Sequence, residues 1–222
     1  MQIAIDGPAG AGKSTIARRL ADELGFVYID TGAMYRCLTW KAINNKIELA
    51  DVEQLTLMAR DTRIEFRQGT DQQLVFCDGQ DVSSAIRSHE VNAAVSQVAS
   101  HPEIRRIMVH QQQDMACNHS VVMDGRDIGE CVLPRAEYKF FLTASIEERA
   151  RRRQADLAGT GSSPGYEAVK KEIKERDKND TSREVGALKV LSDSIIIDTS
   201  SMSINDLMKL MLVTIRGSGH AL

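Results

Sequence analysis

Residues 2–31 read QIAIDGPAGAGKSTIARRLADELGFVYIDT, and this stretch decides the fold class. Two short apolar runs, over residues 2–5 and 27–29, predict β-strands. Between them, apolar residues recur at the spacing of one helix face, at Ile16, Ala17, Leu20, Ala21 and Leu24. Gly25 is a typical helix stop. A strand, a helix and a second strand in this order predict a βαβ unit with parallel strands.

The rest of the chain continues the alternation of short apolar runs and longer helical patterns. Three further apolar runs, without alternation of polar residues, cover residues 120–123, 138–142 and 194–197. Such runs are typical of strands buried on both faces, so we expect a parallel sheet covered by helices. Residues 61–88 differ, because RIEF and QLVFCDGQDV are separated by a polar GTDQ turn and contain a DG turn signal. They predict a small antiparallel insert.

Composition and charge narrow the class of protein. The chain has 222 residues, of which 42% are hydrophobic and 27% charged, values that exclude a disordered or collagen-like chain. The net charge of −3 argues against a protein that binds a nucleic acid polymer along its whole surface. No apolar run is long enough to span a membrane, and no secretory signal opens the chain. We therefore expect a cytoplasmic protein without membrane or nucleic acid partners.

The sequence GPAGAGKS at residues 7–14 satisfies the phosphate-loop pattern G-x-x-x-x-G-K-[ST] between a predicted strand and a predicted helix. Glycines let the backbone turn tightly and present N–H groups to phosphate oxygens at the positive end of a helix. Lys13 would meet the β- and γ-phosphates, and Ser14 would offer a hydroxyl ligand to Mg²⁺. The only NK pair, at residues 45–46, lacks the Asp of a GTPase, and no LSGGQ-like transporter segment is present. The pattern favours a small kinase.

Polar residues follow two predicted strands at the sheet edge where ligands bind in open α/β folds. DTGAMYR at residues 30–36 places Asp30 or Thr31 as a helix cap and Arg36 inside the helix. DGRDIG follows at residues 124–129. Arg36 and Arg126 could bind an acceptor phosphate through two parallel hydrogen bonds each. Asp124 could instead orient Mg²⁺ waters, as a Walker-B Asp does.

Two basic segments suggest a lid over polyphosphate. Residues 139–190 contain 12 basic and 9 acidic side chains in a chain that is negative overall. Arg176, Asp180 and Arg183 would share one face if their helix continued, although spacing alone favours an exposed ion-pair ladder. The same holds for Arg149, Arg151, Arg152 and Arg153, which cannot all face one cleft. LAGTGSSPG at residues 157–165 predicts a surface loop between two helices.

Six motifs in order give the sequence a specific resemblance: GPAGAGKST, DTGAMYR, VNAAVSQVA, HPEIR, MDGRDIG and EIKERDKNDTSR. Together they resemble bacterial-type cytidylate kinases, members of the nucleoside monophosphate kinase family, from about residue 3 to residue 197. The resemblance implies a phosphate-loop NTPase-type α/β fold with a parallel five-stranded sheet. It also implies an inserted monophosphate-binding lobe, with a small antiparallel sheet and helices, and a short lid. We expect one domain over 1–222, with its core at 1–37, 101–150 and 168–222, the lobe at 38–100 and the lid at 151–167.

The resemblance also implies roles for individual residues. Arg36 and Arg126 would hold the CMP phosphate, Arg176 and Asp180 would face the ribose, and the cytosine would be surrounded by Thr31, Ser96, Arg105, Asp127 and Arg183. ATP would be bound by Gly7, Pro8, Ala9, Gly10, Ala11, Gly12, Lys13, Ser14 and Thr15, with Arg153 assigned from the arginine run. The catalytic residues would be Lys13, Arg126 and Arg176, and the ligands of Mg²⁺ would be Ser14 and Asp124.

The reaction implied is ATP + CMP ⇌ ADP + CDP, with dCMP as a second acceptor. Two alternatives remain from the sequence. One is a phosphate-loop kinase for another small acceptor, such as UMP, AMP or a shikimate-like alcohol, and an acceptor panel separates these. The other is a regulatory protein that binds ATP without turning over a monophosphate. No stripe typical of a dimer interface is visible, so we expect a monomer.

Overall fold

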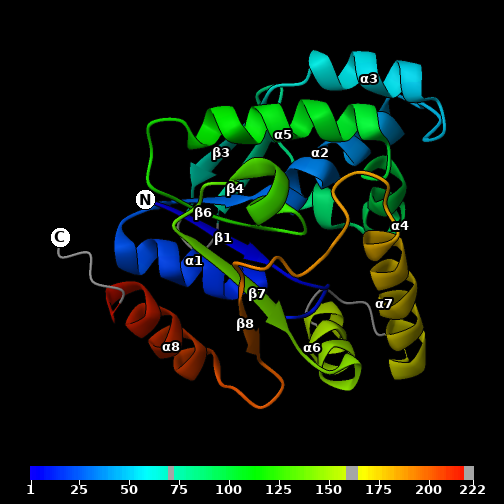
Figure 1. Ribbon diagram of the computed structural model, residues 1–222. Helices are drawn as coiled ribbons and strands as arrows, with labels where there is room; N and C mark the ends of the chain where they lie inside the picture. Colours follow the sequence, from blue (N-terminus) through cyan, green and yellow to red (C-terminus); the bar gives the residue numbers. More distant parts are fainter. Residues whose placement is uncertain (70–72, 159–164, 218–222) are drawn as a thin grey trace. The chain divides into compact units, whose positions relative to one another are not determined.

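A computed structural model describes residues 1–69, 73–158 and 165–217. The chain divides into two compact units (Figure 1). The first comprises Met1–Tyr28 and Asn118–Leu222, and the second comprises Ile29–Cys117. The boundary between Tyr28 and Ile29 falls inside the strand Val27–Asp30. The N-terminal βαβ motif therefore contributes residues to both compact units.

A five-stranded parallel sheet organises the first unit, with strand order β2-β6-β1-β7-β8. Its elements in chain order are β1 (Gln2–Asp6), α1 (Lys13–Leu24), β2 (Val27–Asp30), β6 (Val121–Gly125), the π-helix η2 (Ile128–Val132), β7 (Tyr138–Thr143), α6 (Ile146–Ala158), α7 (Tyr166–Thr181), β8 (Ile195–Asp198) and α8 (Ile204–Gly217). All five strands predicted from apolar runs are confirmed within one or two residues.

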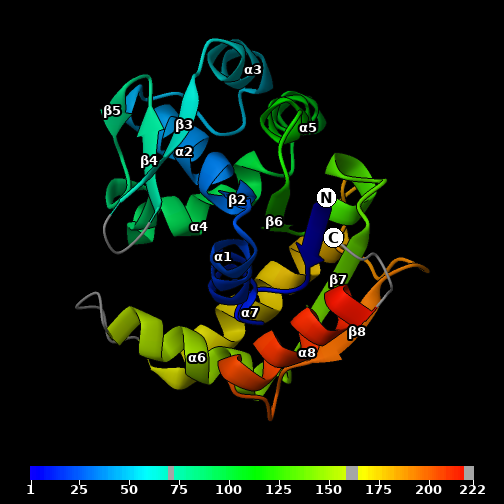
Figure 2. The same ribbon diagram turned by 90° about the vertical axis from the view of Figure 1, so that its left-hand side faces the viewer.

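The sheet holds most of the core of this unit. β6 is buried along its whole length and β7 along all but its last residue, as expected of strands covered on both faces. Helices α1 and α8 lie side by side over one face of the sheet (Figures 1 and 2). Their apolar stripes, which include Ile16 and Leu20 on α1 and Met211 on α8, pack against Ile5 and Phe140 of the sheet. This packing holds the start of α1 at the carboxyl end of β1.

Helices α6 and α7 lie side by side (Figure 2) and form a pair with a small core of its own. Ala150 from α6 packs with Val169 and Ile173 from α7. The predicted surface loop lies between these helices, and its residues 159–164 are outside the described part of the chain. The expected lid range therefore includes the second half of α6 and the first residues of α7.

The second unit combines helices with a small antiparallel sheet of order β3-β4-β5, so the predicted antiparallel insert is confirmed. Asp78 and Gly79 join β4 to β5 with φ of 51° and 83°, as the DG signal predicts. The predicted GTDQ turn between β3 and β4 includes residues 70–72, which are not described. The elements are α2 (Thr31–Asn44), α3 (Val52–Arg60), β3 (Ile64–Gln68), β4 (Gln73–Cys77), β5 (Gln80–Asp81), η1 (Ala85–Arg87), α4 (His89–Val98) and α5 (Pro102–Ala116).

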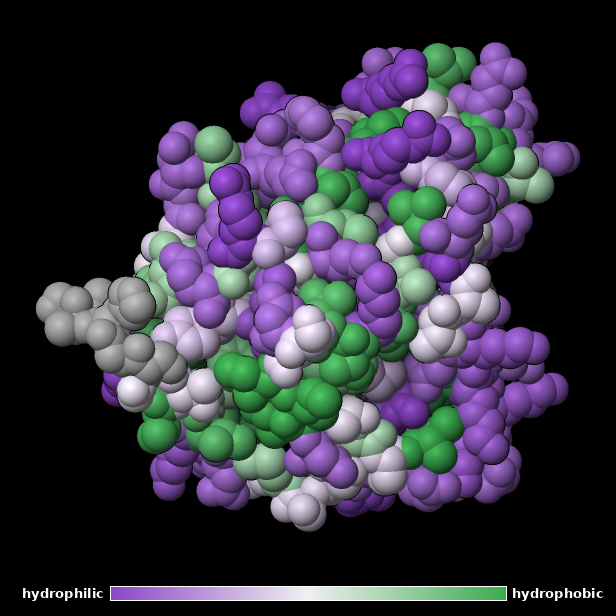
Figure 3. Space-filling model, viewed as in Figure 1, coloured by the Kyte–Doolittle hydropathy of each residue, from purple (hydrophilic) through white to green (hydrophobic). Residues whose placement is uncertain are grey.

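No helix in the described ranges is long and apolar enough to cross a membrane. Hydrophilic side chains dominate the face in Figure 3, where one hydrophobic patch lies over the edge strand β8. Ile195 and Ile196 of this strand are 38% and 59% exposed.

Candidate active site

The phosphate loop occupies residues 7–12 between β1 and α1, as predicted. A Cβ on Gly7, which has φ of 147°, would collide with the carbonyl oxygen of Leu142 at the end of β7. A Cβ on Gly10 would lie 2.9 Å from the carbonyl oxygen of Arg149. Glycine is therefore required at both positions, because neighbouring backbone packs directly against the loop. Gly12 caps α1 without a side chain, which leaves the N–H groups of the first helical turn for a ligand.

Lys13 is the first residue of α1 and is only 6% exposed. Its Nζ donates a hydrogen bond to the carbonyl oxygen of Pro8 at 2.8 Å. Burial, and then the positive charge of Arg126, hold the pKa of Lys13 well below its ordinary value. A polyphosphate beside this ammonium would compensate both effects, so the site fits an anionic ligand.

Ser14 and Asp124, the two predicted metal ligands, are in direct contact. The Ser14 hydroxyl donates to Asp124 Oδ2 at 2.8 Å, and the Tyr28 hydroxyl donates to Asp124 Oδ1 at 2.7 Å. Both predicted ligands offer oxygen, which Mg²⁺ prefers, and both lie beside the phosphate loop. Within the described residues no group of three or more His, Cys, Asp or Glu could hold a metal. The pair fits Mg²⁺ held largely by phosphate and water rather than by a protein cage.

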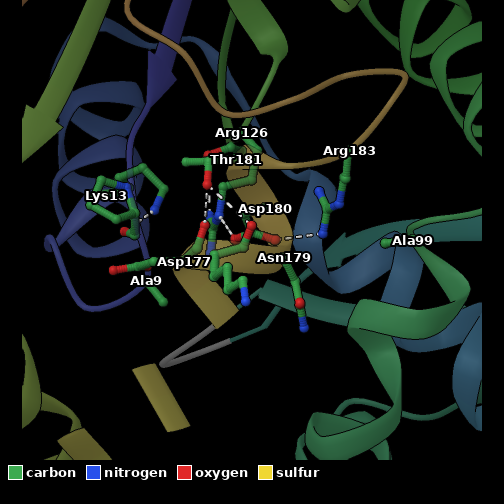
Figure 4. A network of polar contacts seen from close by, with 12 residues as sticks. Ala9, Lys13, Ala99, Arg126, Asp177, Asn179, Asp180, Thr181 and Arg183 are labelled. Atoms are coloured by element: carbon green, nitrogen blue, oxygen red, sulfur yellow. Dashed lines mark hydrogen bonds and ion pairs between the residues drawn. The ribbon is translucent and has the colours of Figure 1, made fainter. Parts of the chain in front are cut away.

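Arg126, Asp180 and Arg183 form an ion-pair cluster (Figure 4). Asp180 Oδ2 accepts from Arg126 Nε at 2.6 Å, and Asp180 Oδ1 accepts from Arg183 Nη2 at 2.5 Å. Burial alone would raise the pKa of Asp180, but the two guanidinium groups lower it below its ordinary value. Burial would lower the pKa of Arg126, yet Asp180 raises it. The cluster stays charged and fixes the Arg126 guanidinium after β6.

The helix does not continue through Arg183, because α7 ends at Thr181, so the condition for a shared helix face is not met. Arg183 lies beyond the helix and returns to Asp180 through the ion pair. Arg176, one turn before Asp180 on α7, lies near enough for its charge to lower the pKa values of both Lys13 and Asp180. The structure thus brings Lys13, Arg126, Arg176, Asp180 and Arg183 into one charged neighbourhood within the first unit.

The arginines of α6 have different surroundings. Arg149 is buried and donates to Asp177 Oδ2 of α7 at 2.6 Å and to the phosphate-loop carbonyl of Ala9 at 3.2 Å. Arg152 binds Glu148 and the carbonyl oxygen of Thr199. Arg151 is exposed and pairs with Glu148. Arg153, the residue assigned to ATP, is half-buried, and its charge acts on Asp156.

In the second unit, Asp30 rather than Thr31 caps α2, by accepting from the Ala33 N–H at 2.8 Å. Thr31 is the buried first residue of this helix. The second oxygen of Asp30 accepts from Arg36 Nη2 at 3.0 Å. Arg36 Nε is buried and finds no hydrogen-bond partner within the described ranges. A half-buried guanidinium with a spare donor is suited to an anionic ligand.

Arg105 and Ser96 also belong to the second unit. Arg105 is 2% exposed, donates to the carbonyl oxygen of Ala99 at 3.1 Å, and lies 5.4 Å from the centre of the Tyr35 ring. Ser96 is half-buried on α4, whose buried stripe consists of Val91, Val95 and Val98. Ser96 therefore lies beside this stripe rather than in it.

Three residues close to the site were not predicted. Tyr28 binds Asp124, Asp177 binds Arg149, and Asp6 accepts hydrogen bonds from the loop that follows Arg126 and Asp127. Asp6 carried a usable signal, since it ends an apolar strand directly before the phosphate loop, much as Asp124 follows the apolar run of β6. Tyr28 and Asp177 carry no comparable signal, because their partners are distant in sequence.

A phosphate loop at the carboxyl end of a parallel sheet, with a Ser hydroxyl bonded to an Asp near the end of a neighbouring strand, defines a phosphate-loop nucleotide-binding protein. The sequence model of the cytidylate kinase family matches residues 3–217, and the chain belongs to that family.

Two relatives illustrate how closely the family matches. A cytidylate kinase of Bacillus cereus (strain G9842) is 50% identical over 217 residues, which cover 98% of this chain and 96% of the relative. A cytidylate kinase of Geobacillus sp. (strain WCH70) is 52% identical over 206 residues, or 93% and 92% of the two chains. Among solved structures, the shikimate kinase of Acinetobacter baumannii in complex with shikimate shares the fold, with a TM-score of 0.50, 15% identity, and coverage of 99% and 95%.

Proposed function

We propose that this protein is a nucleoside monophosphate kinase that transfers the γ-phosphoryl group of ATP to CMP, giving ADP and CDP, and that also accepts dCMP. The observation that carries the proposal is membership of the cytidylate kinase family over residues 3–217, with an intact phosphate loop. Cytoplasmic location and a monomeric state belong to the same proposal.

The ATP phosphates bind to the backbone N–H groups of residues 7–15 and to Lys13, and Arg153 contacts ATP from α6. Ser14 and Asp124 hold Mg²⁺. The metal neutralises charge on the β- and γ-phosphates when it is bound. The Ser14 to Asp124 hydrogen bond supports this assignment, because it holds two oxygen ligands together at the start of α1.

The acceptor phosphate binds to Arg36 and Arg126, and the ribose hydroxyls to Arg176 and Asp180. Cytosine presents an amino donor at N4 beside acceptors at N3 and O2. Asp127 accepts a hydrogen bond from the N4 amino group. The N3 and O2 atoms accept from basic or hydroxyl groups of Ser96, Arg105 and Arg183, with Thr31 nearby. The spare buried Nε of Arg36 and the fixed guanidinium of Arg126 support their role as anion ligands.

Catalysis needs no strong general base, because the acceptor phosphate is largely ionised near neutral pH and already nucleophilic. Lys13, Arg126 and Arg176 neutralise the charge that develops during in-line transfer. Closure of the lid, expected at residues 151–167, excludes water, which would otherwise hydrolyse ATP.

The test is ADP formation by the purified protein with Mg-ATP and one acceptor at a time: CMP, dCMP, UMP, AMP, GMP or shikimate, with a control without acceptor. We expect kcat/KM to be highest for CMP or dCMP. Highest turnover with UMP, AMP or shikimate would mean that the proposed acceptor is wrong, while phosphoryl transfer from ATP to a small molecule would stand. ATP binding without turnover of any acceptor would contradict the proposal and favour a regulatory role.

A further inference from the structure

The carboxylate of Asp6 connects the strand that feeds the phosphate loop to the loop that carries Arg126 and Asp127. Its two oxygens accept from two consecutive backbone N–H groups, Oδ1 from Ile128 at 2.9 Å and Oδ2 from Gly129 at 2.8 Å. Asp6 is only 7% exposed, so these bonds form in a nearly dry environment.

The register of the sheet explains why Asp6 reaches this loop. β1 and β6 pair in parallel, and Asp6 lies opposite Gly125 in the ladder. The chain leaves β6 at Gly125 and begins the π-helix η2 at Ile128. The first N–H groups of a helix have no hydrogen-bond acceptor within the helix. The Asp6 carboxylate accepts from two of these groups in η2. Both ends of the four-residue segment 125–128 are thereby fixed against β1.

We propose that Asp6 is a positioning residue for CMP, which orients Arg126 and Asp127 by fixing the backbone of Ile128 and Gly129. This inference rests on the proposed function, in which Arg126 binds the acceptor phosphate and Asp127 binds cytosine. Asp6 itself touches neither substrate.

A purely structural role explains the carboxylate less well. A buried carboxylate is an expensive way to satisfy two N–H groups, because ionised groups lose solvation on burial. Burial, with a smaller contribution from Asp127, raises the pKa of Asp6 to about 6, against opposing effects of the two backbone N–H groups and Lys13. Only a carboxylate, however, places two equivalent acceptors opposite two adjacent donors. The side-chain amide of Asn would turn an NH₂ group toward one of them.

The main experiment is Asp6→Asn, with KM for CMP, KM for ATP, kcat and the ratio of CMP to UMP turnover measured at pH 7.5. We expect KM for CMP to rise about tenfold and the preference for CMP over UMP to fall, because Asp6 no longer fixes the backbone next to Arg126 and Asp127. KM for ATP should change by less than about threefold, since Lys13 and the glycines remain in place.

Tyr138→Phe is the matched control. It removes a buried hydrogen bond in the same unit, from the Tyr138 hydroxyl to the carbonyl oxygen of Ile215 at 2.9 Å, at the start of β7 rather than its end. It should lower thermal stability and leave both KM values unchanged. If Asp6→Asn fails to fold, Asp6→Glu replaces it, because Glu keeps two acceptors and moves them by one methylene.

Three outcomes are distinguishable. A CMP-specific rise in KM supports the proposal. Equal rises in both KM values, or no rise in either variant of Asp6, would overturn it and leave the CMP kinase reaction intact. A wild-type protein that binds ATP but does not phosphorylate CMP would instead overturn the proposed function and this inference with it.

Discussion

At the scale of single residues, the site is organised around buried charges of both signs. Lys13, Arg126, Arg176 and Arg183 share their neighbourhood with Asp180 and Asp124. Burial, and then the charge of Arg126, lower the pKa of Lys13, while the carboxylates of Asp124 and Asp180 oppose this effect. Buried charged groups lower the stability of the free protein and raise its affinity for a polyanion. This is common in preformed binding sites.

Lys13→Ala should therefore abolish turnover without unfolding the protein. We expect kcat/KM for ATP to fall by at least about a thousandfold, because the ammonium on the β- and γ-phosphates is lost. The melting temperature should stay the same or rise, since an unfavourable buried charge is removed. Steady-state kinetics and thermal unfolding measure the two effects. Lys209→Ala, an exposed lysine on α8, is the control, and turnover near the wild-type level in Lys13→Ala would contradict the assignment.

Asp6 should make stability depend on pH in an unusual direction for a carboxylate. Its pKa of about 6 lies above the ordinary value of 3.8, so the folded state holds the proton more tightly than the unfolded state. The contribution of Asp6 to stability is therefore lost as pH rises from about 4 through 6, by up to about 3 kcal/mol for the full shift. Thermal unfolding of wild type and Asp6→Asn between pH 4.5 and 7.5 measures this. The stability of Asp6→Asn relative to wild type should rise with pH, whichever of the two proteins is more stable at pH 4.5, and a constant difference would show that Asp6 keeps its ordinary pKa.

At the scale of elements, apolar runs predicted every strand of the parallel sheet, because burial on both faces leaves a clear signal in sequence. The end of α7 was less predictable. Thr181 turns its hydroxyl back to the Asp177 carbonyl, and the Asp180 carbonyl accepts from the Leu188 N–H, so the following loop replaces the next helical turn. The end of α7 thus depends on the hydrogen bond from the Leu188 N–H to the Asp180 carbonyl, eight residues apart. Helical periodicity in the sequence does not indicate such a contact.

The candidate site was predictable where its residues belong to local motifs and unpredictable where they meet through the fold. Motifs gave Lys13, Ser14, Asp124 and Arg126. The bonds from Asp6 to Gly129 and from Arg149 to Ala9 join residues 123 and 140 positions apart. No local sequence motif relates the residues of either pair, because parallel strands and their crossover helices bring these segments together only in the folded protein.

The Arg149 to Asp177 ion pair should couple α6 to α7. Both side chains are mostly buried, and Asp177 Oδ1 has no hydrogen-bond partner within the described ranges. Removing either charge alone leaves the other buried without its ion-pair partner. Arg149→Met and Asp177→Asn should therefore each lower the free energy of unfolding by about 1–3 kcal/mol. The double variant should be more stable than the sum of the two losses predicts, by about 1 kcal/mol or more. Urea unfolding of the four proteins gives the coupling energy, and additive losses would mean that the pair contributes nothing of its own.

At the scale of the whole molecule, the sequence pattern of the family extends over both compact units, from residue 3 to residue 217. Charge is distributed unevenly along the chain, because the net value of −3 includes a segment, residues 139–190, in which basic side chains outnumber acidic ones. Local charge therefore indicates the binding site better than the overall charge does. The same contrast between average and local composition applies to hydrophobicity, since the face in Figure 3 is largely polar and yet has a hydrophobic patch over β8.

That hydrophobic patch bears on the oligomeric state. β8 is the last strand of its sheet and pairs with β7 alone in the described sheet order, and Ile195 and Ile196 are exposed on it. An open apolar edge can pair with another copy, but β8 has only four residues, ends in Asp198 and follows Asp193 closely, and these charges oppose such pairing. We therefore expect a monomer in size-exclusion chromatography with light scattering. Ile196→Lys should leave the mass, kcat and KM unchanged while raising solubility, because it adds a charge at the edge. A wild-type dimer that Ile196→Lys converts to a monomer would instead identify β8 as an interface between two copies.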